Sequence, residues 1–395
     1  MRRAFRAAPA IAAAMLLLAT PARAYDDPVS KQAVEMPSYT TVGGKTIKKV
    51  RVGWEAYGKL SPNKDNVILI THFFSGDSHA AGKYKPGDAA PGYWNSIIGP
   101  GKPLDTNKYY VISSDTLVNL SAKNPGVVTT GPASINPDTG KPYGMDFPIV
   151  TIRDFVNVQK ALLESLGITR LEAVMGASMG ALQAIEWAAA YPDMVKRVIP
   201  VIGAGEIDGW AAGWLDIWAS PIRLDPNWNN GAYYGKAEPE AGLALALKIV
   251  TLHAQNPARI NKAFGKKWAK EGADPLASFD NLYAVSASLN AAAAARAKVA
   301  DANHFLYLAR ANELFVAGHG GSIEDGLKKI KAPMLLLPAK GDLLLFPAMS
   351  ARVRDIVKAN GGQVEYLELV GDFGHLDGVI GIAQASDAIR AFLAK

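Results

Sequence analysis

The feature that most limits the fold of this chain is an alternation of helix-like and strand-like segments near its centre. Residues 151–168 show apolar spacings of three and four and end near Gly167, which is typical of a helix with a stop signal. A short apolar run follows at 171–178, then a helical pattern at 181–192 and a second apolar run at 195–204. This order predicts a parallel sheet with helices on both faces.

The same kinds of segment lie on both sides of this region. Before it, strands are predicted at residues 46–58, 66–74 and 109–115, of which the second is a continuous apolar run rich in β-branched residues. After it, the sequence predicts the strands 333–342 and 364–370 and helices near 347–359 and 379–394. The chain is therefore expected to be of the α/β class.

Strand signals disappear between residues 205 and 328, where Ala-rich helical stretches such as 238–254 and 289–315 dominate. We therefore expect a core formed by residues 25–204 and 329–395, with a helical insertion at 205–328. Such an insertion lies where a lid would cover a site. A length of 395 residues suits one large domain of this kind.

The first 24 residues have the pattern of a secretory signal peptide. Arg2, Arg3 and Arg6 precede an apolar run rich in Ala and Leu, and Ala22-Arg23-Ala24 is a small-x-small cleavage site. We expect export to the periplasm or beyond, with Tyr25 as the first mature residue. An uncleaved anchor is the alternative, and the sequence leaves the choice between the general secretory and twin-arginine routes open.

Charge, cysteine content and hydropathy exclude several functional classes. Removing the predicted signal takes away four arginines and no acidic residue, so the formal charge falls from +6 to +2. No basic stripe with interleaved aromatic residues remains, so nucleic-acid binding is not expected. The chain has no cysteine, which excludes disulfides, thiolate zinc sites and a cysteine nucleophile. No later segment offers about 18 uninterrupted apolar residues, so no stable membrane span is expected after signal cleavage.

The stretch 172-EAVMGASMGALQAIEWAAAYP-192 places Ser178 in a G-x-S-x-G pattern between a predicted strand and a predicted helix. Small residues at Gly176 and Gly180 permit a sharp turn, which exposes a serine at the carboxyl edge of the sheet. The helix that starts there also directs free N–H groups at an incoming oxyanion. Ser178 is therefore the predicted nucleophile. A serine that merely closes a strand-to-helix turn is the alternative.

A serine hydroxyl needs a base, and in a fold of this type the acid and then the histidine follow the serine along the chain. His375 lies in the polar, glycine-bearing loop 371–378 after the last predicted strand and is the predicted base. Asp342 ends the predicted strand 333–342 and is the predicted acid. Asp372 is the rival acid, although it lies only three residues from His375.

The other five histidines are expected to have structural roles. His253 and His304 fall within predicted helices of the insertion, as packing or surface residues, and His319 lies in a Gly-rich loop. His72 and His79 are conceivable metal ligands, but no carboxylate cluster at metal-binding spacing accompanies them. No metal or organic cofactor is therefore expected.

An oxyanion hole needs a second donor from the loop after an early strand. In 71-THFFSGDSH-79 the predicted strand ends at a histidine that is followed by a bulky pair. We predict that the backbone N–H of Phe74, together with that of Met179, stabilises a tetrahedral intermediate.

Several long stretches of the sequence match one enzyme family. They include 72-HFFSGDSHAAG-82, 129-TTGPASINPDTGKPYGMDFPIVTIRD-154 and 301-DANHFLYLARANELF-315, and together with the segments around the three predicted catalytic residues they cover most of residues 45–385. On these stretches the chain resembles the homoserine O-acetyltransferase group of α/β-hydrolase-fold enzymes. The resemblance implies the α/β-hydrolase fold and the triad Ser178, Asp342 and His375, with Phe74 and Met179 as oxyanion donors. It also implies a helical lid over a narrow tunnel and a homodimer that pairs through the lid helices.

Two positions depart from the pattern of that family, and both concern the substrate. Where the family carries an arginine for the substrate carboxylate, 217-IWASPIRLDPNW-228 has Ala219, and Arg223 is offset by about a turn. Where the family commonly has an aspartate facing the substrate amine, directly after the catalytic histidine, this chain has Leu376, and Asp377 is shifted by one. A small zwitterionic acceptor thus loses both of its ionic anchors.

These departures and the predicted export favour an exported serine ester hydrolase that acts on a small-molecule ester or acyl donor. Acetyl-CoA is a cytoplasmic metabolite, so water or a different alcohol is expected to receive the acyl group. The alternatives are an O-acyltransferase and a non-catalytic binding protein on the same scaffold. Trp218, with Trp210 and Trp214 at a spacing of four, predicts either an aromatic wall of the substrate site or plain packing of a lid helix.

Overall fold

The structure, a computed structural model, describes Tyr25 and residues 28–395. The predicted signal peptide, residues 1–24, lies outside the described residues. An eight-stranded sheet with the strand order β1-β2-β6-β3-β7-β8-β9-β10 forms its centre. The pairs β1–β2 and β2–β6 are antiparallel, and the remaining neighbours are parallel. The expected α/β fold with a mostly parallel sheet is confirmed.

The elements have the following bounds. The strands of the large sheet are β1 (Gln32–Thr40), β2 (Thr46–Tyr57), β3 (Val67–Thr71), β6 (Tyr110–Ser114), β7 (Ala173–Ala177), β8 (Val198–Val201), β9 (Met334–Leu336) and β10 (Val364–Tyr366), and a small pair is formed by β4 (Ile98–Gly99) and β5 (Leu104–Asp105). The α-helices are α1 (Ile152–Ser165), α2 (Met179–Ala190), α3 (Gly209–Leu224), α4 (Glu240–His253), α5 (Pro257–Phe264), α6 (Ala284–Ala297), α7 (Ala302–Glu313), α8 (Ile323–Leu327), α9 (Pro347–Ala359) and α10 (Ser386–Leu393).

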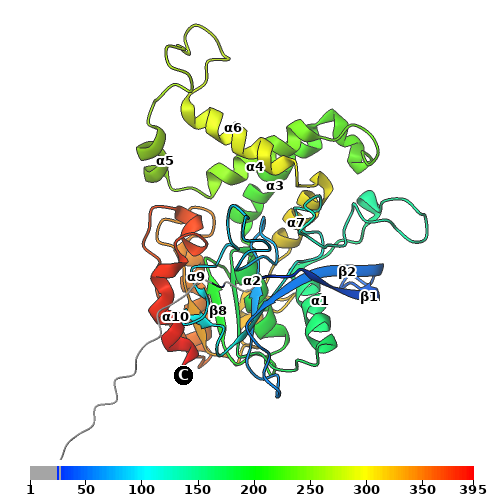
Figure 1. Cartoon of the computed structure of the whole chain (residues 1–395), viewed down its shortest axis with the longest axis vertical. Helices are drawn as coiled ribbons and strands as arrows, with labels where there is room; N and C mark the ends of the chain where they lie inside the picture. Colours follow the sequence, from blue (N-terminus) through cyan, green and yellow to red (C-terminus); the bar gives the residue numbers. More distant parts are fainter. Residues whose placement is uncertain (1–24, 26–27) are drawn as a thin grey trace, which may run out of the picture.

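The central strands are apolar throughout because both faces of the sheet are covered. In β3, Val67 and Leu69 belong to one hydrophobic cluster, whereas Ile68 and Ile70 belong to a second cluster on the opposite face. Successive side chains of a strand point to opposite faces, so a strand between two helical layers reads as a continuous apolar run. Helices α1, α2 and α9 contribute to the first cluster and α10 to the second. Figure 1 shows these helices packed around the sheet.

Local signals explain where α1 begins and ends. The hydroxyl of Thr151 accepts a hydrogen bond from the backbone N–H of Asp154, and the Asp154 carboxylate accepts one from the backbone N–H of Thr151. This reciprocal pair is a capping box, which satisfies two N–H groups that the helix leaves unpaired. Gly167, two residues past the end of α1, has a φ of 69°, a conformation that favours glycine. The predicted helix at 151–168 is therefore present.

Between β8 and β9 the described chain forms helices α3 to α8 and contributes no named strand. Figure 1 shows α3 to α6 gathered above the sheet, at the end opposite the C-terminus. In this group α3 packs against α4 and α7, and α4 packs against α6. Across the part of the chain that the structure describes, no helix combines the length and apolar character needed to cross a membrane.

Several elements differ from the sequence-based expectations, among them the predicted strand 333–342, of which β9 keeps only three residues. The antiparallel partner β1 was not predicted, because only one of its nine side chains, that of Val34, is buried. The predicted strand 364–370 shortens to the three residues of β10. The predicted helix 379–394 is α-helical only from Ser386, after the 3₁₀ turns Gly374–Gly378 and Ile382–Ala385.

Candidate active site

Ser178 lies at a sharp turn between β7 and α2. Its backbone φ of 58° and ψ of −123° are unusual for a residue with a side chain and are of the kind that functional sites retain. Gly176 and Gly180 must be glycines because neighbouring atoms leave no room for a side chain at either position. A Cβ at Gly176 would lie 2.1 Å from the Thr71 hydroxyl oxygen, and one at Gly180 would lie 2.1 Å from the Thr71 carbonyl oxygen. The G-x-S-x-G pattern therefore reflects close packing of the turn against the end of β3.

The structure brings the three predicted triad residues together. The Nε2 atom of His375 lies 2.8 Å from the Oγ atom of Ser178. The Nδ1 atom of the same ring lies 2.7 Å from Oδ2 of Asp342. With the proton on Nδ1, His375 donates to Asp342 and accepts from the serine hydroxyl, which is the arrangement that general-base activation of a serine requires.

Asp342 is held from both sides. Its Oδ1 atom accepts hydrogen bonds from the backbone N–H groups of Leu344 at 2.8 Å and Leu345 at 3.1 Å. Its Oδ2 atom remains for His375. The side chain is almost completely buried, so its orientation is fixed by the loop that follows β9. The rival Asp372 is exposed and makes no contact with His375 among the described hydrogen bonds.

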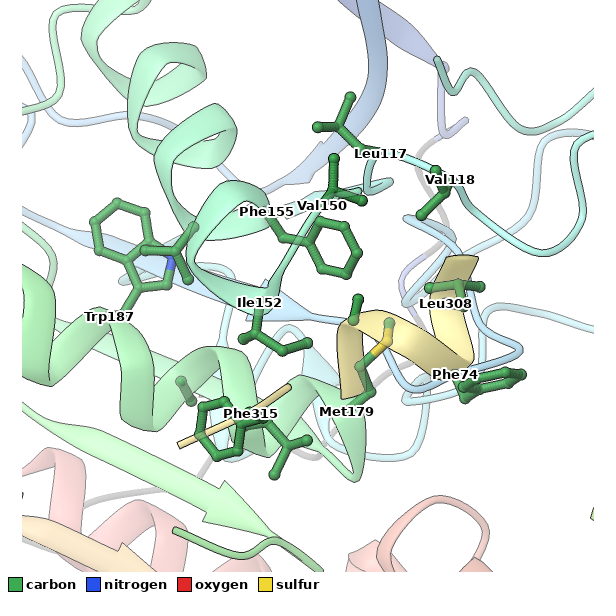
Figure 2. Close-up of a cluster of buried hydrophobic side chains, with 14 of the residues drawn as sticks. Phe74, Leu117, Val118, Val150, Ile152, Phe155, Met179, Trp187, Leu308 and Phe315 are labelled. Carbon is green, nitrogen blue, oxygen red and sulfur yellow. The ribbon is translucent and has the colours of Figure 1, made fainter. Parts of the chain in front are cut away.

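The two predicted oxyanion donors flank Ser178 in the same cavity. Both Phe74 and Met179 line it, and within residues 28–395 neither backbone N–H donates to another protein group. Met179 is the first residue of α2, where helical N–H groups have no partner within the helix. Figure 2 shows the side chains of Phe74 and Met179 within a buried apolar cluster that includes Ile152 and Leu308. The core thus holds the two donor segments in place.

The cavity next to Ser178 is predominantly apolar. The cavity itself is small, with room of about 90 Å³ for water-sized molecules. Its walls come from the loop after β3, from α2, from helices α3, α4 and α7, and from the loops that carry Asp342 and His375. Among the residues that the structure describes, no Asp, Glu, Lys or Arg side chain lines the cavity. The lining residues are Phe73, Phe74, Ser75, Ser178, Met179, Leu182, Ile207, Ala211, Trp214, Leu215, Trp218, Val250, His253, Ala254, Asn312, Leu344, Leu345, His375, Leu376 and Val379.

Known proteins resemble this chain over most of its length. The family described as alpha/beta hydrolase fold matches residues 107–379. The homoserine O-acetyltransferase of Symbiobacterium thermophilum is 39% identical over 352 residues, which are 89% of this chain and 90% of that protein. The crystal structure of esterase E22 has a TM-score of 0.89 and 56% identity, covering 92% of this chain and 100% of that one. The crystal structure of homoserine O-acetyltransferase from Bacillus anthracis has a TM-score of 0.89 and 37% identity, covering 93% and 98%. The chain belongs to the homoserine O-acetyltransferase family.

Membership of the homoserine O-acetyltransferase family makes the chain an α/β-hydrolase-fold enzyme, an acyltransferase or an esterase. The resemblance stated from the sequence motifs is therefore confirmed. The two named activities share the fold, so the choice between them depends on the site. Three residues, Arg223, Trp218 and Asp377, are the candidates for substrate binding.

Of those three residues, only Trp218 lines the cavity. The candidate Arg223 does not line the cavity, and its guanidinium pairs with Asp216 on the exposed side of α3. The candidate Asp377 does not line the cavity either. Its carboxylate is buried beside Gly371, where a Cβ would lie 2.0 Å from Oδ1, and it accepts from the backbone N–H of Phe373. Neither side chain can replace the ionic anchors that are missing from the homoserine O-acetyltransferase pattern.

One histidine has a place that the sequence did not reveal. His253, expected to be a packing or surface residue, lines the cavity and packs against Trp214, with ring centroids 4.1 Å apart and the ring planes tilted by 37°. Burial lowers its pKa below the usual histidine value. Its position results from the packing of α4 against α3, which no local sequence pattern reports.

Three of the other histidines bind neighbouring groups of the protein. His304 accepts a hydrogen bond from the backbone N–H of Ala133 and contacts the Asn119 carbonyl oxygen through its other ring nitrogen. His72 contacts the carbonyl oxygen of Phe73, and His79 pairs with Glu55. Among the described residues, no three His, Asp or Glu side chains are arranged to hold a metal ion.

A buried ionic network holds the loop that follows β3, in which Phe74 and His79 lie. The Glu55 carboxylate, fully buried, accepts from Lys31 at 2.9 Å and from His79 at 3.0 Å, and from the hydroxyl of Tyr84 at 2.6 Å. Although burial opposes its ionisation, the hydrogen bond from His79 and the charge of Lys31 bring the pKa of Glu55 from 4.5 down to about 2. Lys31 also lies 3.5 Å from Asp115.

We expect the Glu55 network to contribute stability that depends on pH. Because the folded-state pKa is depressed, the contribution is complete above the unfolded pKa of about 4.5 and is lost as pH falls towards 2. By linkage the loss amounts to about 2 kcal/mol between pH 6 and pH 3. Urea unfolding of the wild type and Glu55→Gln across this range should show the difference in free energy of unfolding shrinking by about that amount. A difference that stays constant with pH would contradict the assignment.

Proposed function

We propose that this chain is an exported serine esterase that hydrolyses an uncharged carboxylic ester through an acyl-serine intermediate. The observation that carries the proposal is the lining of the cavity beside Ser178, to which Tyr25 and residues 28–395 contribute no Asp, Glu, Lys or Arg side chain. An apolar site accepts an uncharged ester without desolvating an unpaired charge. The same site offers no partner to the carboxylate or the ammonium group of homoserine, whose unpaired burial is strongly unfavourable.

The geometry supports a two-step reaction. The Ser178 Oγ atom attacks the ester carbonyl while His375 Nε2, 2.8 Å away, takes its proton. The backbone N–H groups of Phe74 and Met179 stabilise the negative charge on the tetrahedral oxygen. His375 then protonates the leaving alcohol, and the acyl group remains on Ser178. In the second step His375 takes a proton from water, which attacks the acyl-serine and releases the carboxylic acid.

The predicted export supports hydrolysis over transfer from acetyl-CoA. A chain with the signal-like residues 1–24 would act in the periplasm or beyond, away from cytoplasmic acetyl-CoA. Water is the acceptor available there at high concentration. The high similarity to esterase E22, at 56% identity, supports the same choice.

The second candidate function is O-acyl transfer to an alcohol. It is favoured by relatives that carry the name homoserine O-acetyltransferase and are 37–39% identical to this chain. A non-catalytic binding protein is the third candidate, which the assembled triad disfavours. The homodimer through the lid helices, implied by the resemblance, remains a prediction.

The test uses residues 25–395 with p-nitrophenyl acetate, in the presence and absence of L-homoserine. Free acetate and O-acetylhomoserine are quantified by mass spectrometry. We expect acetate to accumulate at the same rate with and without homoserine. Dominant formation of O-acetylhomoserine would overturn the hydrolase proposal in favour of transfer, and the absence of both products would favour the binding protein.

The substitution Leu376→Asp should increase acyl transfer to homoserine relative to hydrolysis. Leu376 lines the cavity next to His375, so an aspartate there places a carboxylate where the ammonium group of an amino-acid acceptor can bind. A hydrogen bond to a charged group contributes about 1.5–3 kcal/mol, which predicts a change of about 10- to 100-fold in the product ratio. Leu376→Asn is the control, because asparagine has nearly the same shape as aspartate but carries no charge. If both variants gave the same ratio of O-acetylhomoserine to acetate, the proposed role of the charge would be refuted.

A further inference from the structure

The turn between α4 and α5 lies against both loops that complete the triad. Helix α4 ends at His253, three residues follow, and α5 begins at Pro257. The loop after β9 carries Asp342, and the loop after β10 carries His375. The residues of the α4–α5 turn, 253–259, contact each of these loops at two points.

The contacts with the Asp342 loop involve His253 and Asn256. His253 Nε2 lies 3.2 Å from the carbonyl oxygen of Leu343, and a carbonyl accepts, so this ring nitrogen carries the proton. Leu343 is the residue between Asp342 and the first of the two backbone N–H groups that hold the carboxylate. On the other side of Asp342, a Cβ at Gly341 would lie 2.6 Å from Nδ2 of Asn256. The turn therefore contacts the chain immediately before and after the acid.

The contacts with the His375 loop involve Gly374 and Phe373. Gly374 has a φ of 67°, and a Cβ there would lie 3.0 Å from the backbone N atom of Asn256. The Arg259 guanidinium lies over the Phe373 ring, with its central carbon 4.5 Å from the ring centroid. Arg259 is itself oriented by a hydrogen bond of 2.6 Å to the Gln255 side chain. The two residues before His375 are thus both covered by the turn.

The same turn contributes to the substrate cavity. His253 and Ala254 line it, and the His253 ring contacts Trp214 of α3. Arg259 and Asn256 are not among the lining residues. The α4–α5 turn therefore contacts helix α3, contributes to the cavity wall, and contacts the two loops that carry Asp342 and His375.

We propose that the α4–α5 turn positions the acid and base loops of the triad, with Arg259 and His253 as positioning residues. The inference rests on the proposed function of Ser178, Asp342 and His375. Arg259 fixes the loop of the base through Phe373, and His253 fixes the loop of the acid through the Leu343 carbonyl. The orientation of His375 thereby depends on how α4 and α5 pack. A movement of either helix changes the reactivity of Ser178.

The test measures kcat and KM for p-nitrophenyl acetate, together with the rate at which diisopropyl fluorophosphate labels Ser178. Arg259→Leu should lower kcat and the labelling rate by about 3- to 30-fold, the range expected from a cation–π contact of 0.5–2 kcal/mol. KM should stay within about twofold, because Arg259 does not line the cavity. The downfield proton resonance of His375 Nδ1–H should broaden or shift in the variant. A merely structural role would change stability but leave this resonance unmoved.

The matched control is Lys262→Leu, which removes the same charge one turn later on α5 at an exposed position. Arg259→Lys keeps the charge without the planar stack and should recover only part of kcat. His253→Gln should retain a higher kcat than His253→Leu, because the glutamine amide can still donate to the Leu343 carbonyl. If Arg259→Leu fails to fold, this pair of variants tests the contact with the Asp342 loop instead. If Arg259→Leu and Lys262→Leu have equal kcat and equal labelling rates, the positioning role is refuted. If the wild type neither turns over nor labels, the proposed function fails instead.

Discussion

Replacing Ser178 with alanine should remove hydrolysis of p-nitrophenyl acetate almost entirely, with kcat falling by about 10⁴- to 10⁶-fold. The expected loss is large because the Oγ atom is the group at the turn to which His375 Nε2 is hydrogen-bonded, and the chain has no cysteine that could replace it. The residual rate would come from the oxyanion donors and from binding. Labelling by diisopropyl fluorophosphate, read by mass spectrometry of the intact protein, should disappear in parallel.

Ser75→Ala is the matched control for this substitution. Ser75 lines the same cavity and makes no contact with His375, so its loss should change kcat by only a few-fold. If Ser178→Ala kept activity within about 100-fold of the wild type, a different nucleophile would have to be sought. Circular dichroism and thermal unfolding of both variants establish that the fold is intact.

Asp342→Asn should lower kcat by about 10⁴-fold while leaving KM nearly unchanged. The Oδ1 position is fixed by two backbone donors, the N–H groups of Leu344 and Leu345. The asparagine oxygen will take that position, which turns the NH₂ group towards His375. An N–H donor facing Nδ1 stabilises the tautomer with the proton on Nε2, and that tautomer cannot accept the Ser178 proton.

The control for this substitution is Asp372→Asn. Asp372 is exposed, so the change should leave kcat within about twofold of the wild-type value. Comparable losses in the two variants would mean that the base is oriented by the loop as a whole rather than by Asp342. The comparison also decides between the two acids that the sequence left in competition.

Much of the fold could be predicted from the sequence because local patterns and packing agree along the central strands. The run that became β3 is apolar on both faces, and the capping residues of α1 mark its start. The strand β1 could not be predicted, since an exposed edge strand lacks the apolar alternation that identifies a strand. The final helix begins later than predicted because the backbone around Gly378 and Gly381 forms 3₁₀ turns instead.

The triad could be predicted because each member ends a strand or follows one closely, and chain order limits the choice. Ser178, Asp342 and His375 lie within hydrogen-bonding distance as that reasoning requires. Two of the three substrate-binding candidates, Arg223 and Asp377, do not line the cavity, and for Arg223 the reason is physical. Whether Arg223 faces the cavity or Asp216 depends on the rotation of α3, which results from its packing against α4 and α7. Side-chain direction on a packed helix is a property of the assembled fold and not of a motif.

The order of the triad along the chain has a consequence for synthesis. Ser178 and His375 are 197 residues apart, and helices α3 to α8 lie between them. A nascent chain that has been made as far as residue 341 holds the nucleophile but neither the acid nor the base. Contacts of such long sequence separation form late in folding. The proposed esterase activity therefore requires the last strand and the loop that carries His375 to be in place, so a chain that ends before them lacks it.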